Sequence, residues 1–124
     1  MAKVASLQDA QKFLDNFVRP MERVANGKMN PLERMRYLLS RLKNPHNKFP
    51  SLVVSGTSGK GSTTYMIASM LTKAGYKTGM TVSPHIESIT ERLQICGKQI
   101  SEKGFVSLVQ SLIPAIEEMK TSAY

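Results

Sequence analysis

The chain has 124 residues, of which 41% are hydrophobic and 21% are charged. This composition supports one ordinary globular core and excludes a fibrous repeat or a chain that is disordered throughout. No apolar run approaches the roughly 18 residues that cross a bilayer, and the first twenty residues carry Asp9 and Asp15 in place of an apolar leader. The single cysteine, Cys96, excludes an intramolecular disulfide. We therefore expect a cytoplasmic protein without a membrane partner.

The formal net charge is +8, from 17 basic and 9 acidic side chains. Residues 1–50 hold ten basic and four acidic side chains, and residues 51–124 hold seven and five. The charges are scattered along amphipathic patterns with few aromatic residues between them, which favours solvated helix faces over a nucleic-acid surface. No nucleic-acid partner is expected, although a non-catalytic nucleotide- or nucleic-acid-binding module stays an alternative.

The first predicted helix begins after Ser6. Ser6 is followed three residues later by Asp9, as in a capping box, and the helix is predicted to run to about Val18, before Pro20. Its apolar residues recur at spacings of three and four: Leu7, Ala10, Leu14, Phe17 and Val18. One face of this helix is therefore expected to be buried.

A second helix is predicted to begin at Pro31. Asn30 supplies an N-cap, Pro31 suits the first helical position, and Glu33 places an acid in the first turn. Its apolar stripe consists of Leu32, Met35, Leu38, Leu39 and Leu42. Asn44 and Pro45 are predicted to end it.

An alternating α/β pattern follows. Residues 52–54 form an apolar run without polar alternation, typical of a central strand of a parallel sheet. The glycine-rich residues 56–61 break this strand, and a helix is predicted from there to Gly75. A second strand over residues 78–82 completes a predicted βαβ unit. The expected fold class is α/β, a parallel sheet flanked by helices and preceded by two helices.

The rest of the chain predicts a hairpin and one more helix. Residues 94–100 have the pattern of a small hairpin around Gly97-Lys98. Apolar residues then recur at helical spacing from Phe105 to Ile116, with Pro114 expected to bend or restart that helix.

The glycine-rich loop is the strongest chemical signal. Gly56, Gly59 and Gly61 allow a tight turn whose N–H groups point inward, and Lys60 adds a full charge ahead of a helix N-terminus. This pattern favours a phosphate chain. The standard Walker A spacing is not met, because Val54 stands where the first glycine belongs. A strand-to-helix turn with an incidental lysine is the alternative.

A second group of polar residues follows the second predicted strand. Ser83 and Pro84 either form an ordinary turn or place a serine hydroxyl as a Mg²⁺ ligand at the sheet edge that also carries the glycine loop. His85 either binds substrate or caps the turn. Glu91 and Arg92 form either a surface ion pair or an anion clamp, and their spacing does not decide between the two.

Three separated motifs, LVVSGTSGKGST, AGYKTGMTVSPH and ERLQICGKQIS, resemble the N-terminal part of folylpolyglutamate synthases and dihydrofolate synthases, within the Mur ligase superfamily. The resemblance runs from Arg34 through Ile116. It implies an ATP-dependent ligase that adds L-glutamate to a folate or dihydropteroate carboxylate through an acyl phosphate. It also implies that residues 1–50 are an N-terminal helical segment and that residues 51–124 begin the ATP-binding central domain.

The resemblance also implies roles for individual residues. Mg²⁺ is bound by Ser83, and Lys60 is the catalytic cation on the transferred phosphoryl group. His85 and Arg92 lie on a loop that closes near the folate site. ATP phosphates are held by the loop residues Gly56, Thr57, Ser58, Gly59, Lys60, Gly61 and Ser62. The family usually has Asn at the position of Ser58 and Thr or Ser at that of Val82, which changes loop hydrogen bonding and leaves the charges intact.

The chain stops at Tyr124, before the downstream metal ligands and C-terminal domain of the family. We expect a fragment that does not catalyse ligation alone and that is monomeric at full length. The sequence does not decide between dihydrofolate synthesis, polyglutamate extension or both. A Mur ligase that acts on cell-wall peptide precursors is the rival enzyme, and it is less consistent with the second and third motifs.

Overall fold

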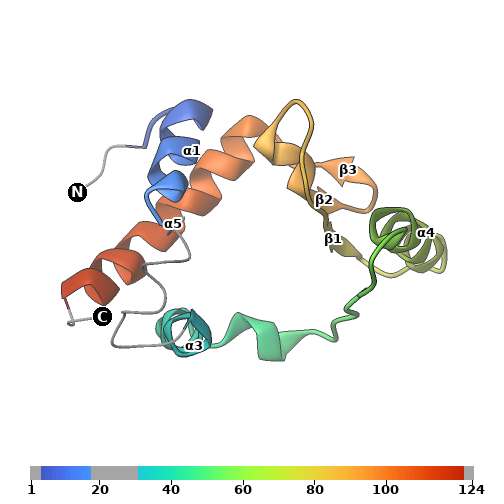
Figure 1. The fold of residues 1–124 in the computed structure, drawn as a ribbon, viewed down its shortest axis with the longest axis horizontal. Helices are drawn as coiled ribbons and strands as arrows, with labels where there is room; N and C mark the ends of the chain where they lie inside the picture. Colours follow the sequence, from blue (N-terminus) through green and yellow to red (C-terminus); the bar gives the residue numbers. More distant parts are fainter. Residues whose placement is uncertain (1–3, 18–30, 122–124) are drawn as a thin grey trace. The chain divides into compact units, whose positions relative to one another are not determined.

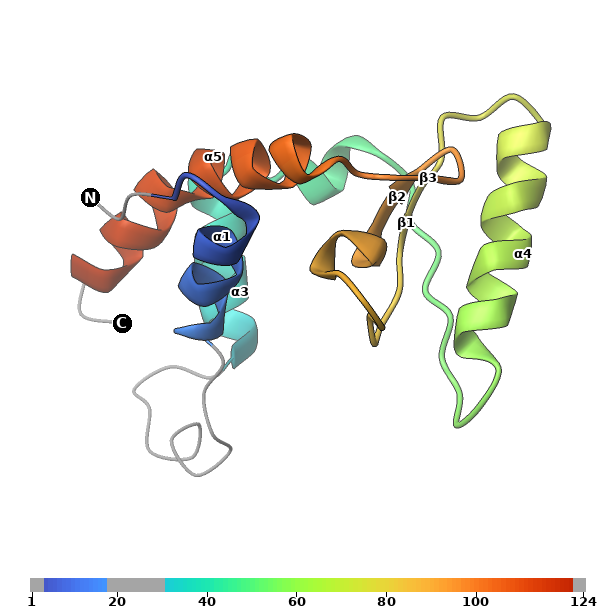
Figure 2. The ribbon, with the colours of Figure 1, turned by 90° about the horizontal axis from the view of Figure 1, so that it is seen from above.

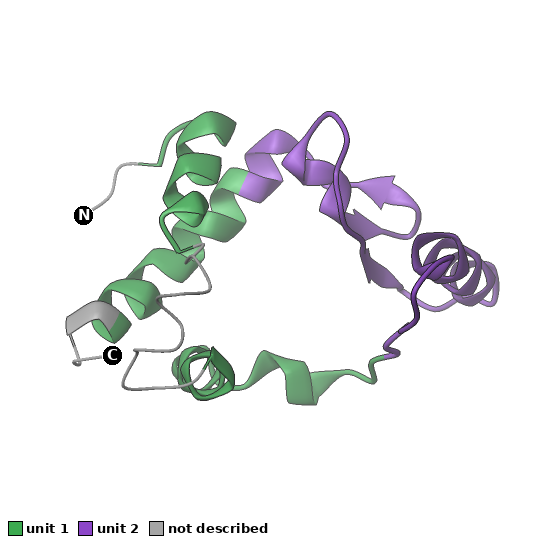
Figure 3. Ribbon diagram, viewed as in Figure 1, with its two compact units in different colours: residues 1–51, 106–124 green, residues 52–105 purple. Residues whose placement is uncertain are grey.

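The computed structural model describes residues 4–17 and 31–121. The chain forms two compact units (Figure 3): unit 1 contains residues 1–51 and 106–124, and unit 2 contains residues 52–105. Residues 106–124 belong to unit 1, whereas the sequence predicted that they share a domain with residues 51–105. The division into functional domains stays a prediction. None of the helices in the described ranges combines the length and the apolar character that a bilayer crossing requires.

The first helix of unit 1 is α1 (Leu7–Asp15; Figure 1), and the side chains of Ser6 and Asp9 cap its first turn. Ser6 Oγ accepts a hydrogen bond from the Asp9 amide at 3.1 Å, and the Asp9 carboxylate accepts one from the Ser6 amide at 3.0 Å. The predicted capping box is confirmed, and it satisfies first-turn N–H groups. The predicted end at Val18 and Pro20 lies outside the described residues.

The core of unit 1 lies between α1 and most of helix α5 (Glu102–Thr121), which run beside each other in both views (Figures 1 and 2). Gln110 Nε2 donates a hydrogen bond to the Val4 carbonyl at 2.7 Å, which ties the N-terminal segment to α5. The buried apolar side chains of this unit are Val4, Ala10, Phe13, Val109, Ile113, Ala115, Ile116 and Met119. α5 continues through Pro114, so the predicted helix forms and does not restart there.

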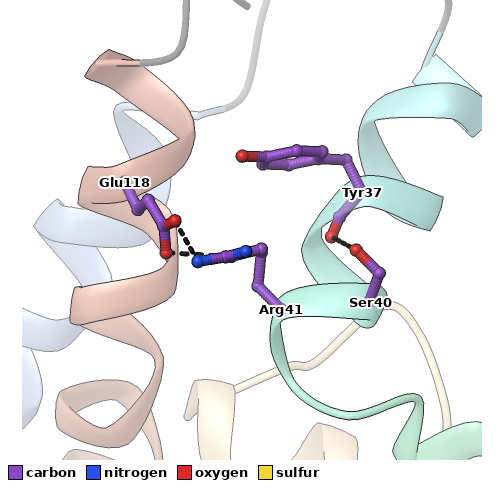
Figure 4. Close-up of polar contacts among 4 residues, drawn as sticks. All are labelled: Tyr37, Ser40, Arg41 and Glu118. Carbon is purple, nitrogen blue, oxygen red and sulfur yellow. Dashed lines mark hydrogen bonds and ion pairs between the residues drawn. The ribbon is translucent and has the colours of Figure 1, made fainter.

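Helix α3 (Pro31–Arg41) begins at the predicted proline, and the 3₁₀ helix η1 (Pro45–Lys48) follows it. The predicted N-cap, Asn30, lies outside the described residues. Arg41 forms a two-pronged ion pair with Glu118 of α5, with Nε 2.9 Å from Oε2 (Figure 4). Both side chains are 45% exposed, so water screens the ion pair and it contributes little to stability. No residue of α3 is buried, although the helix carries an apolar stripe.

Unit 2 contains one helix and a small sheet. Helix α4 (Lys60–Lys73) precedes β1 (Gly79–Thr81), and the 3₁₀ helix η2 (Ile89–Arg92) leads into β2 (Leu93–Ile95) and β3 (Lys98–Gln99). The strand order is β1-β2-β3, and both pairs are antiparallel. α4 packs beside β1. The start of α4 and the end of β1 lie at the same end of the unit, the lower end in Figure 2.

The predicted hairpin is confirmed, with its turn one residue earlier than expected. Cys96 and Gly97 join β2 to β3 with φ values of 48° and 75°. Positive φ at both central positions is the geometry that matches the twist of a two-residue hairpin. The predicted helix before Gly75 also forms as α4, and Gly75 follows it with φ 89°. No residue of α4 is buried, so its apolar pattern predicted the helix but not its environment.

The expected parallel sheet is not present among the described residues. Residues 52–54 form no strand, and Leu52 and Val53 are 71% and 90% exposed. A strand requires a hydrogen-bonded neighbour, and β1 pairs instead with β2, which returns beside it in the opposite direction. The strand prediction over residues 52–54 is therefore wrong for this structure.

We predict that truncating Ile113 destabilises the protein far more than truncating Ile86. Ile113 is 7% exposed and Ile86 is 90% exposed, so only the first substitution removes buried apolar atoms and leaves a cavity. The expected loss in the free energy of unfolding is about 2–5 kcal/mol for Ile113→Ala and within about 0.5 kcal/mol for Ile86→Ala. Urea unfolding followed by circular dichroism measures both, and equal losses would contradict the assigned core.

Candidate functional site

The glycine loop leads directly into α4. Gly59 is the N-cap residue of the helix with φ 74°, and Gly56 has φ 152°. These backbone conformations are readily available to glycine and rare for residues with a side chain. The whole loop is exposed, including the side chains of Thr57, Ser58 and Ser62. The predicted glycine loop therefore forms an exposed turn at the N-terminus of α4, and no strand precedes it.

The first turn of α4 is open to an anion. Gly59 has no side chain that accepts a hydrogen bond from the first-turn amides, and the turn contains no acidic residue. The first intrahelical bond is donated by the Thr63 amide to the Gly59 carbonyl at 3.0 Å, so the preceding helical amides have no helical acceptor. With the positive end of the helix dipole, these amides fit a phosphate group.

Lys60 folds back across the glycine loop. Its Nζ donates hydrogen bonds to the Gly56 carbonyl at 2.7 Å and to the Thr57 carbonyl at 3.3 Å. These contacts keep a full positive charge at the mouth of the loop, beside the open first turn of α4. The structure therefore places the Lys60 ammonium on the glycine loop, and its role toward phosphate stays a prediction.

The loop after β1 carries the second predicted group. Ser83 is exposed, and the Ser83–Pro84 peptide bond is cis. This loop and the start of α4 lie at the same end of unit 2 (Figure 2). No hydrogen bond within the described ranges joins the glycine loop to residues 83–92. The described residues also contain no cluster of three or more acidic, histidine or cysteine side chains that could hold a metal. The assignment of Ser83 as a Mg²⁺ ligand stays a prediction.

The structure brings His85 and Arg92 together. Arg92 Nε donates a hydrogen bond to His85 Nδ1 at 2.8 Å, and both residues are half-buried. Because Nδ1 accepts this hydrogen bond, the neutral imidazole carries its proton on Nε2. The two candidate substrate residues therefore form one unit, in which the arginine sets the tautomer of the histidine.

Glu91 accepts hydrogen bonds from three consecutive backbone amides. Its carboxylate oxygens lie 2.8 Å from the amide nitrogen of Ile86, 2.8 Å from that of Glu87 and 2.7 Å from that of Ser88. The predicted ion pair between Glu91 and Arg92 does not form, because the Glu91 carboxylate is engaged by its own loop, while the anion clamp stays a prediction. Ser88 and Glu91 have the S-x-x-E spacing of a capping box, which is a sequence signal for this role.

The same hydrogen bonds act on the ionisation of Glu91. Those from the Ile86 amide first, and then from Ser88 and Glu87, hold the pKa of the Glu91 carboxyl below its usual range. They stabilise the charged form, which accepts hydrogen bonds better than the protonated form. The nearby His85 contributes a further, smaller lowering.

Tyr65 and Gln94 connect the segment that carries Glu91 to α4. No short-range sequence pattern indicates this connection. Gln94 Nε2 donates to the Tyr65 hydroxyl at 2.7 Å and to the Glu91 carbonyl at 3.3 Å. Tyr65 lies on α4, 29 residues before Gln94 in the chain. The contact depends on α4 packing beside the sheet, so only the tertiary structure shows it.

Comparison with known proteins identifies relatives. A dihydrofolate synthase/folylpolyglutamate synthase from Bacillus subtilis is 36% identical over 117 residues, which are 94% of this chain and 26% of that protein. A folylpolyglutamate synthase from Mycobacterium tuberculosis, solved with ADP and AMPPCP, matches with a TM-score of 0.81 at 31% identity, over 96% of this chain and 24% of its own. By sequence and fold, the chain belongs with the folylpolyglutamate and dihydrofolate synthases.

This finding confirms the family resemblance of the three motifs. A further solved member, a folylpolyglutamate synthase in complex with AMPPCP and folate, matches with a TM-score of 0.82 at 27% identity, over 95% of this chain and 27% of its own. No protein-family model matches the chain. The chain spans about a quarter of the length of these relatives.

We predict that Gly59→Ala and Gly61→Ala have opposite effects. An added Cβ meets no atom within 4 Å at either position, but Gly59 has φ 74° whereas Gly61 lies inside α4 without a positive φ. Gly59→Ala is expected to lower the free energy of unfolding by about 1–2 kcal/mol through backbone strain. Gly61→Ala is expected to raise it by up to about 1 kcal/mol through helix propensity. Urea unfolding compares them, and equal effects would contradict the loop conformation.

We predict that the loop around residues 86–88 loses its anchor in acid. Because the folded pKa of Glu91 is lowered, its stabilising contribution is complete above the unfolded value of about 4.3 and is lost as the pH falls through the lower folded pKa. In an NMR titration, the Glu91 carboxyl carbon and the amides of Ile86 to Ser88 should share one midpoint below about 4.3. A midpoint at or above that value, or separate midpoints, would contradict the anchor.

Proposed function

We propose that the chain is the nucleotide-binding part of an ATP-dependent ligase that adds L-glutamate to a folate or dihydropteroate carboxylate. The observation that carries this proposal is the open first turn of α4, with Lys60 held across the glycine loop before it. The relatives support it, since folylpolyglutamate synthases have been solved with ADP, AMPPCP and folate.

The glycine loop would bind the phosphate chain of ATP. The exposed amides at the start of α4 donate hydrogen bonds to phosphate oxygens, and the loop residues 56–59 allow the close approach that this requires. On binding, the Lys60 ammonium exchanges its carbonyl partners for phosphate oxygens. There it stabilises the negative charge of the transferred phosphoryl group.

Transfer of the γ-phosphoryl group to the substrate carboxylate would form an acyl phosphate, and the amino group of glutamate would then displace phosphate. Mg²⁺ would neutralise phosphate charge, and Ser83 is the residue of this chain proposed to bind it through the hydroxyl oxygen. Ser83 fits a hard cation in its donor atom and its exposure. His85 and Arg92 are proposed to face the folate substrate.

The two alternatives gain no support from the structure or the relatives. The relatives reported above are folate enzymes, whereas the rival Mur ligase would act on cell-wall peptide precursors. The basic residues of the described ranges lie on separate helices and loops. Dihydrofolate synthesis and polyglutamate extension both fit the proposed chemistry.

The reaction is tested by phosphate release. The full-length gene product is supplied with ATP, Mg²⁺ and L-glutamate, together with dihydropteroate, tetrahydrofolate or a nucleotide-linked muropeptide. We expect release with one or both of the pterin substrates and none with the muropeptide. Release with the muropeptide alone would assign the chain to cell-wall synthesis instead.

We predict that Lys60→Ala weakens ATP binding about ten- to a hundredfold, because it removes charge-assisted hydrogen bonds to phosphate. Lys77→Ala is the matched control, since Lys77 is an exposed lysine of the same unit outside the loop. Isothermal titration calorimetry with ATP and Mg²⁺ measures both variants, with circular dichroism to verify folding. Equal affinities for the two variants would remove Lys60 from the phosphate site.

A further inference from the structure

We propose that Glu91 and Arg92 are positioning residues that hold residues 85–88 of the substrate loop, residues 83–88, before substrate binds. The proposal rests on the proposed function, in which this loop faces the folate substrate. The two residues act on the loop in different ways. Glu91 shapes its backbone, and Arg92 fixes the ring of His85.

The loop is not held in place by its own apolar side chains. Ile86 is 90% exposed, and Ser83, Pro84 and Glu87 are exposed as well. Burial therefore contributes little to the conformation of the loop. Directional hydrogen bonds must supply the order instead, and the side chains of Glu91 and Arg92 make them to four of the six loop residues, residues 85–88.

Glu91 imposes curvature on the backbone. Three consecutive amides point toward one carboxylate, at 2.8, 2.8 and 2.7 Å. Successive amides of an extended chain alternate in direction, so this convergence requires a curved loop. Replacing the carboxylate removes the one protein acceptor that these three amides share, and nothing then draws them to a common point.

Arg92 acts on the first functional side chain of the loop. Its Nε donates to His85 Nδ1 at 2.8 Å, which leaves Nε2–H of the neutral ring as the donor toward a ligand. An oxygen acceptor, such as a carboxylate or a pterin carbonyl, suits this donor. Because residues 91 and 92 are adjacent in η2, one short helical turn holds both ends of the segment from His85 to Ser88.

The helical turn that supplies these anchors is itself fixed. Thr90 is 3% exposed, and its hydroxyl lies 2.8 Å from Ser88 Oγ. The Val82 amide donates to the Arg92 carbonyl at 3.2 Å, and Gln94 links the Glu91 carbonyl to Tyr65 of α4. The loop is therefore positioned relative to α4, whose first turn carries the proposed phosphate site.

A set of three variants separates positioning from charge. Glu91→Ala removes all three acceptors, and Glu91→Gln keeps one carbonyl oxygen and the side-chain shape. Glu87→Ala is the matched control, because it removes an exposed glutamate from the same loop while leaving its backbone amide in place. Arg92→Lys keeps the charge and removes the Nε donor to His85.

The first measurement does not depend on the function. We expect hydrogen exchange at the Ile86, Glu87 and Ser88 amides to accelerate about tenfold or more in Glu91→Ala, less in Glu91→Gln, and not in Glu87→Ala. The tautomer of His85 is read from its ring ¹⁵N shifts at about pH 8, where an unperturbed histidine is neutral, with His46 as the internal reference. We expect the Nε2–H tautomer in the wild type and a mixture of tautomers in Arg92→Lys. Unchanged exchange in Glu91→Ala, or no fixed wild-type tautomer, would overturn the assignment.

The second measurement addresses the substrate. In the full-length gene product, Glu91→Ala and Arg92→Lys should raise the KM for the folate substrate about tenfold, with the KM for ATP within about twofold of the wild type. Glu91→Gln should restore part of the loss. An equal rise in both KM values would indicate a general structural defect and overturn the proposal. If the wild type does not use folate substrates, the proposed function and the substrate role of the loop both fail. The hydrogen-exchange rates and the His85 tautomer then still test whether Glu91 and Arg92 hold the loop.

Discussion

Backbone N–H groups at helix starts and in tight loops need acceptors, and this requirement organises the described structure. At α1 and α5, the side chains of Ser6 and Ser101 accept from first-turn amides. In the loop after β1, Glu91 accepts three amides. α4 differs because its N-cap is Gly59, which has no side chain to offer. Side chains thus satisfy the first-turn amides of α1 and α5, whereas those of α4 stay open at the point where we propose that phosphate binds.

The two units are held together internally by different forces. Unit 1 has an apolar core between α1 and α5, whereas Phe105 and Thr90 are the buried residues in the described part of unit 2. Unit 2 exposes several large apolar side chains: Leu52, Val53, Tyr65, Met66, Met70, Tyr76, Ile86 and Ile95. Its conformation therefore depends on hydrogen bonds, which are weaker in sum than a buried core but specify direction. Such bonds suit a unit that has to hold polar groups at fixed positions.

Local signals in the sequence predicted local structure well. The Ser6–Asp9 spacing predicted the first cap, Pro31 the start of α3, and Gly75 the C′ residue of α4, because each acts within one turn of backbone. The hairpin of β2 and β3 was predicted, but the antiparallel pairing of β1 with β2 was not. The apolar run over residues 52–54 indicates a strand, but a strand also needs a partner, and no pattern within the run specifies one.

The sequence by itself determined the glycine loop, the lysine within it, the helix that follows, and the family to which three motifs point. Each of these depends on residues close together in the chain or on their order. Only the tertiary structure decided that Arg92 donates to His85, that Glu91 turns inward to its own loop, and that Gln94 meets Tyr65 of α4. The curvature of a loop and the packing of a helix beside a sheet decide which groups meet in these contacts. Hydrogen bonds act only at short range and in one direction. A side chain with several possible partners in the sequence therefore has one in the folded chain.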